Sequence, residues 1–170
     1  SKKLVNLAKN KLRTNSIFHV DPNKIPETII KDKTSNVISL IGVLEHVISP
    51  NLILDSFRKS KIQYLYLSVP LLSLSTFIEN SFRNVFPRQL AGDHTHLFTK
   101  ESLNYLFKKY NLKIIGEHWF GTDIADLDRS LKVNANFIDK KLFEKIYSKY
   151  FLSVFEDLQN ILDKKKICSE

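Results

Sequence analysis

The fold of this chain follows from one stretch, Val37-Ile38-Ser39-Leu40-Ile41-Gly42-Val43-Leu44-Glu45-His46-Val47, which is followed by Ser49-Pro50. A short, nearly continuous apolar run is typical of a strand in a parallel sheet that is covered on both faces. Ser49 is a suitable N-cap and Pro50 a suitable first helical residue, so we expect a helix directly afterwards. The strand therefore delivers Glu45 and His46 to the carboxyl edge of a sheet, where ligands of open α/β folds bind.

Hydrophobic periodicity and turn residues predict alternating helices and strands along the rest of the chain. Helices are expected over residues 2–12, 26–30, 50–59, 99–109 and 124–131, with a long helix over 139–164. Strands are expected over residues 16–20, 37–43, 63–69 and 112–120. This alternation predicts an α/β fold with a mostly parallel sheet and helices on both faces. Residues 71–98 are aromatic and weakly patterned, which is typical of a functional insertion.

Composition and charge limit the class of protein. A length of 170 residues, with 43% hydrophobic and 26% charged residues, predicts a single globular domain over residues 1–170. We expect a cytoplasmic protein without a membrane partner, because no apolar run could span a bilayer and Cys168 is the only cysteine. The net charge of +8 is spread over expected helix faces, so nucleic acid is not an expected partner.

Five motifs occur in an order and spacing that resemble a known family. They are Asp21 after an expected strand, Leu44-Glu45-His46-Val47, Leu67-Ser68-Val69-Pro70, Gly92-Asp93-His94-Thr95-His96-Leu97-Phe98-Thr99 with Ser102-Leu103, and Leu112-Lys113-Ile114-Ile115-Gly116-Glu117. Together they resemble the second half of the class I S-adenosylmethionine-dependent methyltransferase domain. The resemblance implies a Rossmann-like sheet, S-adenosylmethionine as cofactor, and methyl transfer to a small-molecule or sugar-like acceptor. It also makes residues 71–98 an acceptor-side insertion.

The sequence departs from this family at the cofactor. The family's glycine-rich first loop is absent, and the whole chain holds only four glycines. The acid after the second strand has no counterpart, and the first two strands and the last strand of the family's sheet are not present. Residues 167–170 resemble the lead-in to that last, antiparallel strand. We therefore expect a partial domain whose sheet is completed by a missing segment or an oligomeric partner, with a reorganised remnant fold as the alternative.

The candidate catalytic residues lie at the expected sheet edge. The resemblance implies a cofactor-binding role for Asp21, near the adenine, and for Glu45. From its chemistry, Glu45-His46 could orient the acceptor, contact the cofactor or act as an acid–base pair, or it could merely cap the next helix. His94 and His96 are further acid–base candidates. They could bind a metal with a third ligand such as Glu45, but two histidines are a weak signal, so a structural anchor is expected and no metal site.

Candidate acceptor-binding residues come from two other stretches. His118 and Asp123 flank an aromatic strand end that could form the floor of an acceptor pocket, although core packing explains most of its aromatic residues. Arg83 and Arg88 could hold an anionic acceptor, or be ordinary surface arginines. Two alternative functions stay open: a non-catalytic methyltransferase-like interaction domain, and a nucleic-acid-binding or RNA-modifying domain.

Overall fold

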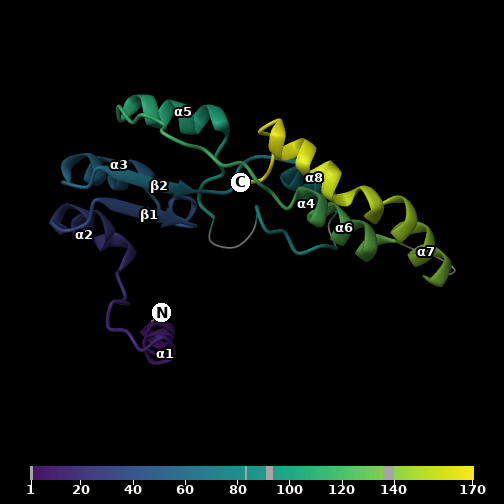
Figure 1. The fold of residues 1–170 in the computed structure, drawn as a ribbon, viewed down its shortest axis with the longest axis horizontal. Coiled ribbons are helices and arrows are strands. Elements are labelled where there is room, and N and C mark those ends of the chain that lie inside the picture. Colours follow the sequence, from purple (N-terminus) through teal and green to yellow (C-terminus); the bar gives the residue numbers. More distant parts are fainter. Residues whose placement is uncertain (1, 83, 91–93, 136–139) are drawn as a thin grey trace. The chain divides into compact units, whose positions relative to one another are not determined.

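The computed structural model describes residues 2–82, 84–90, 94–135 and 140–170 and has an α/β fold (Figure 1). Its elements, in order, are α1 (Lys2–Leu12), η1 (Pro22–Lys24), α2 (Ile25–Lys31), β1 (Val37–Ile41), η2 (Leu44–His46), α3 (Pro50–Lys59), β2 (Tyr64–Ser68), α4 (Leu74–Ser81), α5 (Lys100–Lys109), α6 (Asp123–Asn134), α7 (Lys140–Tyr150), η3 (Leu152–Val154) and α8 (Phe155–Lys164), where η marks a 3-10 turn. They form two compact units: residues up to Ile38 with Ser49–Leu65, and Ser39–Ile48 with Tyr66–Glu170.

The first unit is built around the packing of α2 against α3. Ile29 of α2 is buried, as are Ile53, Leu54 and Phe57, which recur along one face of α3 at helical spacing. Pro50 occupies the first turn of α3, as its fixed backbone angle favours. The helices expected over residues 2–12, 26–30 and 50–59 are confirmed, although α1 buries no side chain.

The two strands β1 and β2 form a parallel sheet. Near their starts, the Asn36 carbonyl accepts hydrogen bonds from the backbone N–H groups of Gln63 and Tyr64, each at 3.0 Å. Near their ends, the N–H of Gly42 donates to the Ser68 carbonyl at 3.2 Å. Residue numbers therefore rise together along both strands, which confirms the expected parallel pairing.

Cover of β1 on both faces, which the apolar sequence predicts, is not found among the described residues. Leu40 is buried, but Val37 and Ile41 are 55% and 64% exposed. Side chains alternate between the faces of a strand, so one face of β1 is packed and the other is open. The physical reason is that the described residues supply only two strands to this sheet, and two strands leave much of their surface uncovered.

Two expected strands do not form ladders. Residues 16–20 and 112–119 have apolar or alternating sequences, yet the structure assigns neither of them to a strand. A strand is stabilised only by a neighbour, and among the described residues the exposed segment 113–118 has no backbone hydrogen bond to another segment. Pairing begins at Phe120, whose N–H and C=O exchange hydrogen bonds with Glu170 at 3.1 and 3.0 Å, an antiparallel pair.

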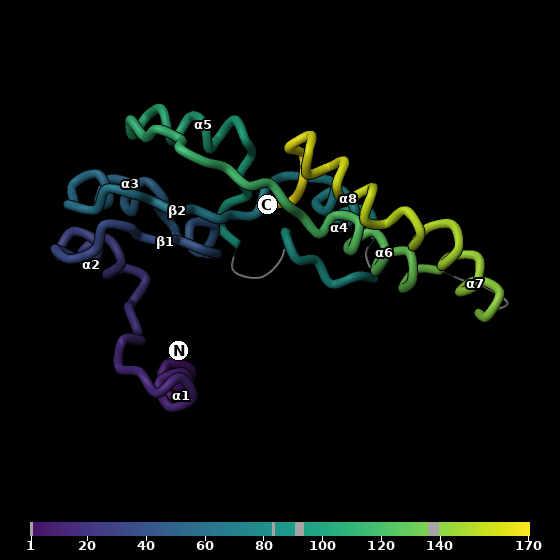
Figure 2. The backbone as a smooth tube through the Cα atoms, in the orientation of Figure 1, coloured from purple at the N-terminus to yellow at the C-terminus, as the bar shows by residue number. Residues whose placement is uncertain are grey.

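In the second unit, α6 packs against both α4 and α8, as the chain trace also shows (Figure 2). The helices expected over residues 99–109 and 124–131 are confirmed as α5 and α6. The single helix expected over residues 139–164 is wrong, because η3 separates α7 from α8. Within this break the Ser153 hydroxyl donates to the Lys149 carbonyl at 2.8 Å, a local bond that competes with the helical ladder. Among the described residues, no helix is both long and apolar enough to cross a membrane.

Candidate functional site

The polar residues after β1 are set in place by a sharp turn at Gly42. Its φ of +60° is a left-handed conformation that glycine adopts without strain, and it ends β1 there. The N–H of His46 then donates to the Val43 carbonyl at 3.1 Å, which closes the η2 turn. Leu44 is fully buried and anchors this turn. The Glu45 side chain folds back toward the end of the strand, where Oε1 lies 3.6 Å from the position that a Cβ on Gly42 would take.

Glu45 is a buried carboxylate with an unsatisfied oxygen. Its side chain lies in the interior, with only 3% of the residue exposed. The described residues supply no hydrogen-bond donor to Oε2. A buried carboxylate is costly unless a donor or a cation compensates it, so this position calls for a positively charged or donating partner.

Two imidazoles meet the Glu45 carboxylate. Nε2 of His46 lies 3.9 Å from Oε1 of Glu45. The rings of His46 and His94 contact edge to face, with centroids 4.7 Å apart and planes at 66°. One ligand atom from each of these residues lies within 4.8 Å of the others. Glu45, His46 and His94, predicted from separate motifs, therefore form one group, which we call the Glu–His–His cluster.

Backbone hydrogen bonds hold His94 against the turn. The Glu45 carbonyl accepts from the N–H groups of Thr95 and His96, at 2.7 and 3.2 Å. The Thr95 hydroxyl lies 3.0 Å from the carbonyl oxygens of both Glu45 and Val47. Segments about fifty residues apart in the sequence are thus fixed together, so the cluster is held by the backbone and not only by its side chains.

His96, expected to act with His94, is engaged differently. Its Nδ1 lies 2.9 Å from the Thr95 hydroxyl, and its ring stacks on Phe98 with centroids 6.0 Å apart. In an extended segment successive side chains point to opposite sides, so two residues spaced by two, such as His94 and His96, are expected to share a side. The double hydrogen bond to the Glu45 carbonyl breaks that alternation, and only His94 joins the cluster.

A second buried acid, Glu79, positions His94 indirectly, through the backbone of Gln89. Glu79 of α4 is 7% exposed and accepts hydrogen bonds from the backbone N–H groups of Arg88, Gln89 and Leu90 at 2.7–3.0 Å. The Gln89 carbonyl in turn lies 3.2 Å from Nδ1 of His94. We did not predict this role from the sequence. The signal available was the spacing of Ser75, Ile78 and Glu79, which places an acid on the buried face of a helix.

Asp123, predicted to bind an acceptor, has its hydrogen-bonding capacity taken up within the chain. It is fully buried and accepts hydrogen bonds from the Ser73 hydroxyl, the Ser75 N–H and the Ser169 N–H, at 2.6, 2.9 and 2.8 Å. Burial raises the pKa of the Asp123 carboxyl, but these hydrogen bonds outweigh it, and the net pKa lies below its usual value of 3.8. Asp123 thus joins α4, α6 and the last residues of the chain, and its role in acceptor binding stays a prediction.

The remaining predicted residues lie outside the cluster. The Arg88 guanidinium donates to the Thr122 hydroxyl at 2.8 Å and lies 3.6 Å from Asp126. The exposed His118 stacks on Phe120, with centroids 5.5 Å apart. Asp21 is exposed and caps its own turn by accepting from the Asn23 N–H at 2.9 Å. Arg83 lies outside the described residues, as does Asp93, the neighbour of His94.

A family profile described as a methyltransferase domain matches residues 4–117, which include the whole Glu–His–His cluster. The chain belongs to the methyltransferase domain family. This membership supports methyl transfer as its general activity. Comparisons with curated proteins and with solved structures gave no match.

Methyltransferase domains generally use S-adenosylmethionine, but the described residues do not fit the whole of this donor. The Asp21 carboxylate accepts a hydrogen bond from the Asn23 N–H of its own turn. Gly121 does not line a cradle, because a Cβ there would come within 2.5 Å of Asp123 Oδ2 and 2.8 Å of the Ser169 nitrogen. At the end of β1, Gly42 lies beside the Glu45 carboxylate, whose Oε2 has no donor among the described residues.

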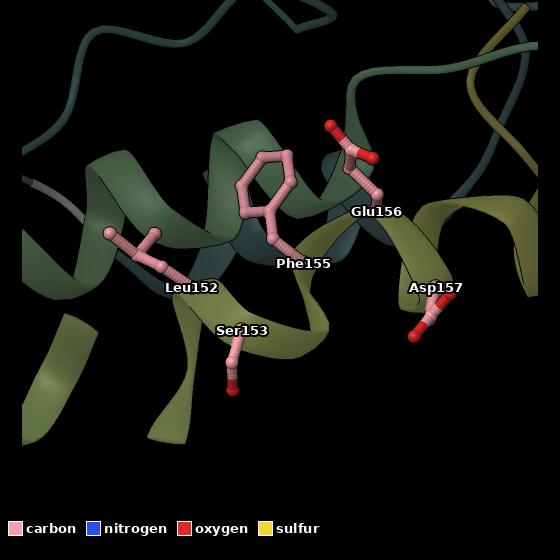
Figure 3. Close-up of a pocket in the computed structure, with 5 residues that line it drawn as sticks. All are labelled: Leu152, Ser153, Phe155, Glu156 and Asp157. Carbon is pink, nitrogen blue, oxygen red and sulfur yellow. The ribbon is translucent and has the colours of Figure 1, made fainter. Parts of the chain in front are cut away.

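This methyltransferase-family chain also has a pocket on η3 and α8 (Figure 3). The residues around it are neighbours in sequence and none was predicted as a site residue: Leu152, Ser153, Phe155, Glu156 and Asp157. A pocket formed by one turn and the start of one helix brings no converging polar groups from other elements, so it is not the candidate site.

Proposed function

We propose that this chain carries the acceptor side of a methyltransferase that methylates a hydroxyl of a small-molecule or sugar-like acceptor. The observation that carries the proposal is the Glu–His–His cluster at the end of β1, within the segment that matches the methyltransferase domain. Polar groups that converge at the carboxyl end of a parallel strand are placed where ligands of α/β folds bind.

Methyl transfer to a hydroxyl requires that the oxygen lose its proton as it attacks the methyl carbon. S-adenosylmethionine is the donor that the family suggests, and it supplies an electrophilic methyl group. His46 is the proposed base, because its side chain is 41% exposed and can reach an acceptor in solvent. The Glu45 carboxylate, 3.9 Å away, would stabilise the imidazolium that results. His94 would orient the same hydroxyl from the opposite segment.

The other predicted residues take outer roles in this proposal. His96 would contact the acceptor beyond His94, and the exposed His118 would contact its far end. Arg88, and Arg83 from the segment before it, would attract an anionic acceptor. Glu45 is the proposed donor contact, and the cofactor role expected of Asp21 stays a prediction. A further segment of methyltransferase sheet, or a second copy, would supply the rest of the donor site, since β1 and β2 alone make a marginal sheet.

The test is transfer of a labelled methyl group from S-adenosylmethionine to a panel of hydroxylated small molecules and sugars. We expect turnover by the native protein and a loss of about 10²–10⁴-fold in His46→Ala, the usual range for removal of a general base. The matched control is His19→Ala, an exposed histidine of the other unit. Absence of turnover in the native protein, or equal turnover in both variants, would contradict the proposal.

A non-catalytic role is the second candidate, and the poor fit to the donor favours it. A folded protein whose melting temperature does not rise with S-adenosylmethionine, although binding to the native state should raise it, would support this alternative. A rise in melting temperature that depends on Glu45 would reject it.

A further inference from the structure

We propose that Glu45, His46 and His94 bind a divalent first-row transition-metal cation. Their donor atoms are one carboxylate oxygen and two imidazole nitrogens, which come from the η2 turn and from the segment ahead of α5. Two histidines and one carboxylate form a common open site for such cations in proteins.

The distances suit ligands of one shared ion. The three donor atoms lie within 4.8 Å of one another, and Nε2 of His46 is 3.9 Å from Oε1 of Glu45. This separation is too long for a hydrogen bond. Two ligands that each lie about 2.1 Å from a cation are separated by about 3–4.2 Å. Two ligands of a tetrahedral ion are about 3.4 Å apart, so the pair at 3.9 Å and the third ligand both need small side-chain movements to share an ion.

Burial of the carboxylate supports the same assignment. Only 3% of Glu45 is exposed to solvent, and its Oε2 has no donor among the described residues. A protonated His46 could partly neutralise Oε1, but it would leave Oε2 without a partner. A cation between the carboxylate and the two rings satisfies the charge of the whole group.

The surroundings of His94 prepare it as a ligand. Its Nδ1 lies 3.2 Å from the Gln89 carbonyl, which can only accept, so Nδ1 carries the proton. In the neutral ring Nε2 then has the free lone pair that a metal requires. The Glu79 carboxylate fixes the Gln89 backbone by accepting a hydrogen bond from the Gln89 N–H. An imidazole oriented by a carbonyl on its second nitrogen is the usual arrangement around protein metal ions.

The ligand types select the class of cation. Imidazole nitrogen favours Zn²⁺, Fe²⁺, Ni²⁺ or Cu²⁺ over Mg²⁺ and Ca²⁺, which prefer oxygen. Three protein ligands leave positions open, and an acceptor hydroxyl could occupy one of them and become more acidic there. That catalytic use rests on the proposed function, whereas binding of the cation does not. With the cation bound, His46 is a ligand and the cation takes over activation of the hydroxyl.

Isothermal titration of the chelator-treated protein with Zn²⁺ tests the proposal, with Mg²⁺ as the contrasting cation. We expect one tight Zn²⁺ site and much weaker Mg²⁺ binding. Glu45→Gln, His46→Ala and His94→Ala should each weaken Zn²⁺ binding by at least about 10-fold. His19→Ala removes an exposed histidine of the other unit and should bind as the native protein does. A Co²⁺ absorption spectrum should change with each cluster variant and not with His19→Ala.

The outcomes separate this inference from the proposed function. Circular dichroism establishes that each variant is folded, and Glu45→Gln keeps the shape of the native side chain. A folded native protein that does not bind Zn²⁺ would overturn the metal site, as would cluster variants that bind as tightly as His19→Ala. Zn²⁺ binding that depends on the cluster supports the site even if no methyl transfer is found. Methyl transfer by a protein that does not bind Zn²⁺ would support the proposed function and reject the metal site.

Discussion

Asp123 and Glu45 are both buried acids next to a turn, yet their surroundings are opposite. Asp123 accepts three hydrogen bonds from Ser73, Ser75 and Ser169, so its charge is compensated within the chain. For Glu45, the described residues supply no donor to Oε2, and two imidazoles lie beside the carboxylate. A compensated acid holds elements together, whereas an uncompensated one is retained at the cost of stability. The difference identifies which carboxylate is available for chemistry.

Of the variants that test this difference between Asp123 and Glu45, Asp123→Ala is expected to lose the most stability. The change leaves the Ser169 N–H and the Ser73 hydroxyl without this acceptor and the Ser75 N–H with only the Ser73 oxygen, and we expect it to lower the free energy of unfolding by about 3–5 kcal/mol. Urea denaturation followed by circular dichroism measures it. Asp128→Ala, at a carboxylate that is less buried in the same helix, is the matched comparison. Equal losses in the two variants would contradict the role given to Asp123.

Glu79 should rank second, because it is compensated by backbone donors alone. In Glu79→Gln the carboxylate that accepts from Arg88, Gln89 and Leu90 becomes an amide with one acceptor oxygen. We expect a loss of about 1–3 kcal/mol in the free energy of unfolding. Since Gln89 orients His94, Zn²⁺ binding should weaken as well. A variant that loses stability but binds Zn²⁺ unchanged would show that Glu79 does not position His94.

The pH dependence of stability should reveal the contribution of the ionised Asp123 carboxylate to folding. Its folded pKa lies below its unfolded value of 3.8, so its contribution is fully present above that value and is lost as the pH falls through it toward the folded pKa. The urea midpoint of the native protein should therefore fall more steeply in acid than that of Asp123→Asn. Parallel curves for the two proteins would argue against a carboxylate stabilised by its hydrogen bonds.

The smallest effect, and the one of opposite sign, is expected for Glu45→Gln. Removal of the uncompensated charge from the metal-free protein should leave stability unchanged or raise it by about 1 kcal/mol. Urea denaturation in the presence of a chelator measures this. A loss as large as that of Asp123→Ala would mean that Glu45 is compensated after all, and the contrast between the two acids would fail.

The part of the site that is local in sequence could be predicted. The strand, the turn and the start of α3 follow from an apolar run with Gly42 and Pro50 at its boundaries, and this placed Glu45 and His46 correctly at the strand end. The partner of this pair was less certain. The sequence indicated His94 and His96 together, because the spacing of two suggests a common side, and it does not contain the hydrogen bonds to the Glu45 carbonyl that separate them.

The errors arise where stability depends on a neighbour that periodicity does not reveal. Residues 112–119 have the alternation of a strand, but alternation says nothing about whether a partner strand lies alongside. The pattern over residues 139–164 is helical, but the bond from Ser153 to Lys149 interrupts it. Asp123 was assigned to an acceptor because it follows an aromatic segment, while its three partners are separated from it by more than forty residues.

The double hydrogen bond at the Glu45 carbonyl has a consequence for evolution and for protein engineering. His94 is held near the turn because the next two residues, Thr95 and His96, donate their N–H groups to the Glu45 carbonyl. Under the proposed function, exposed side chains of residues 71–98 such as Phe77 and Phe86 can therefore be exchanged to suit a different acceptor without moving the reactive groups. A change at Thr95, by contrast, would disturb every acceptor alike. Libraries that vary Phe77 and Phe86 while Ser73, Glu79, Gln89 and Thr95 are kept constant should yield new specificities with little loss of activity.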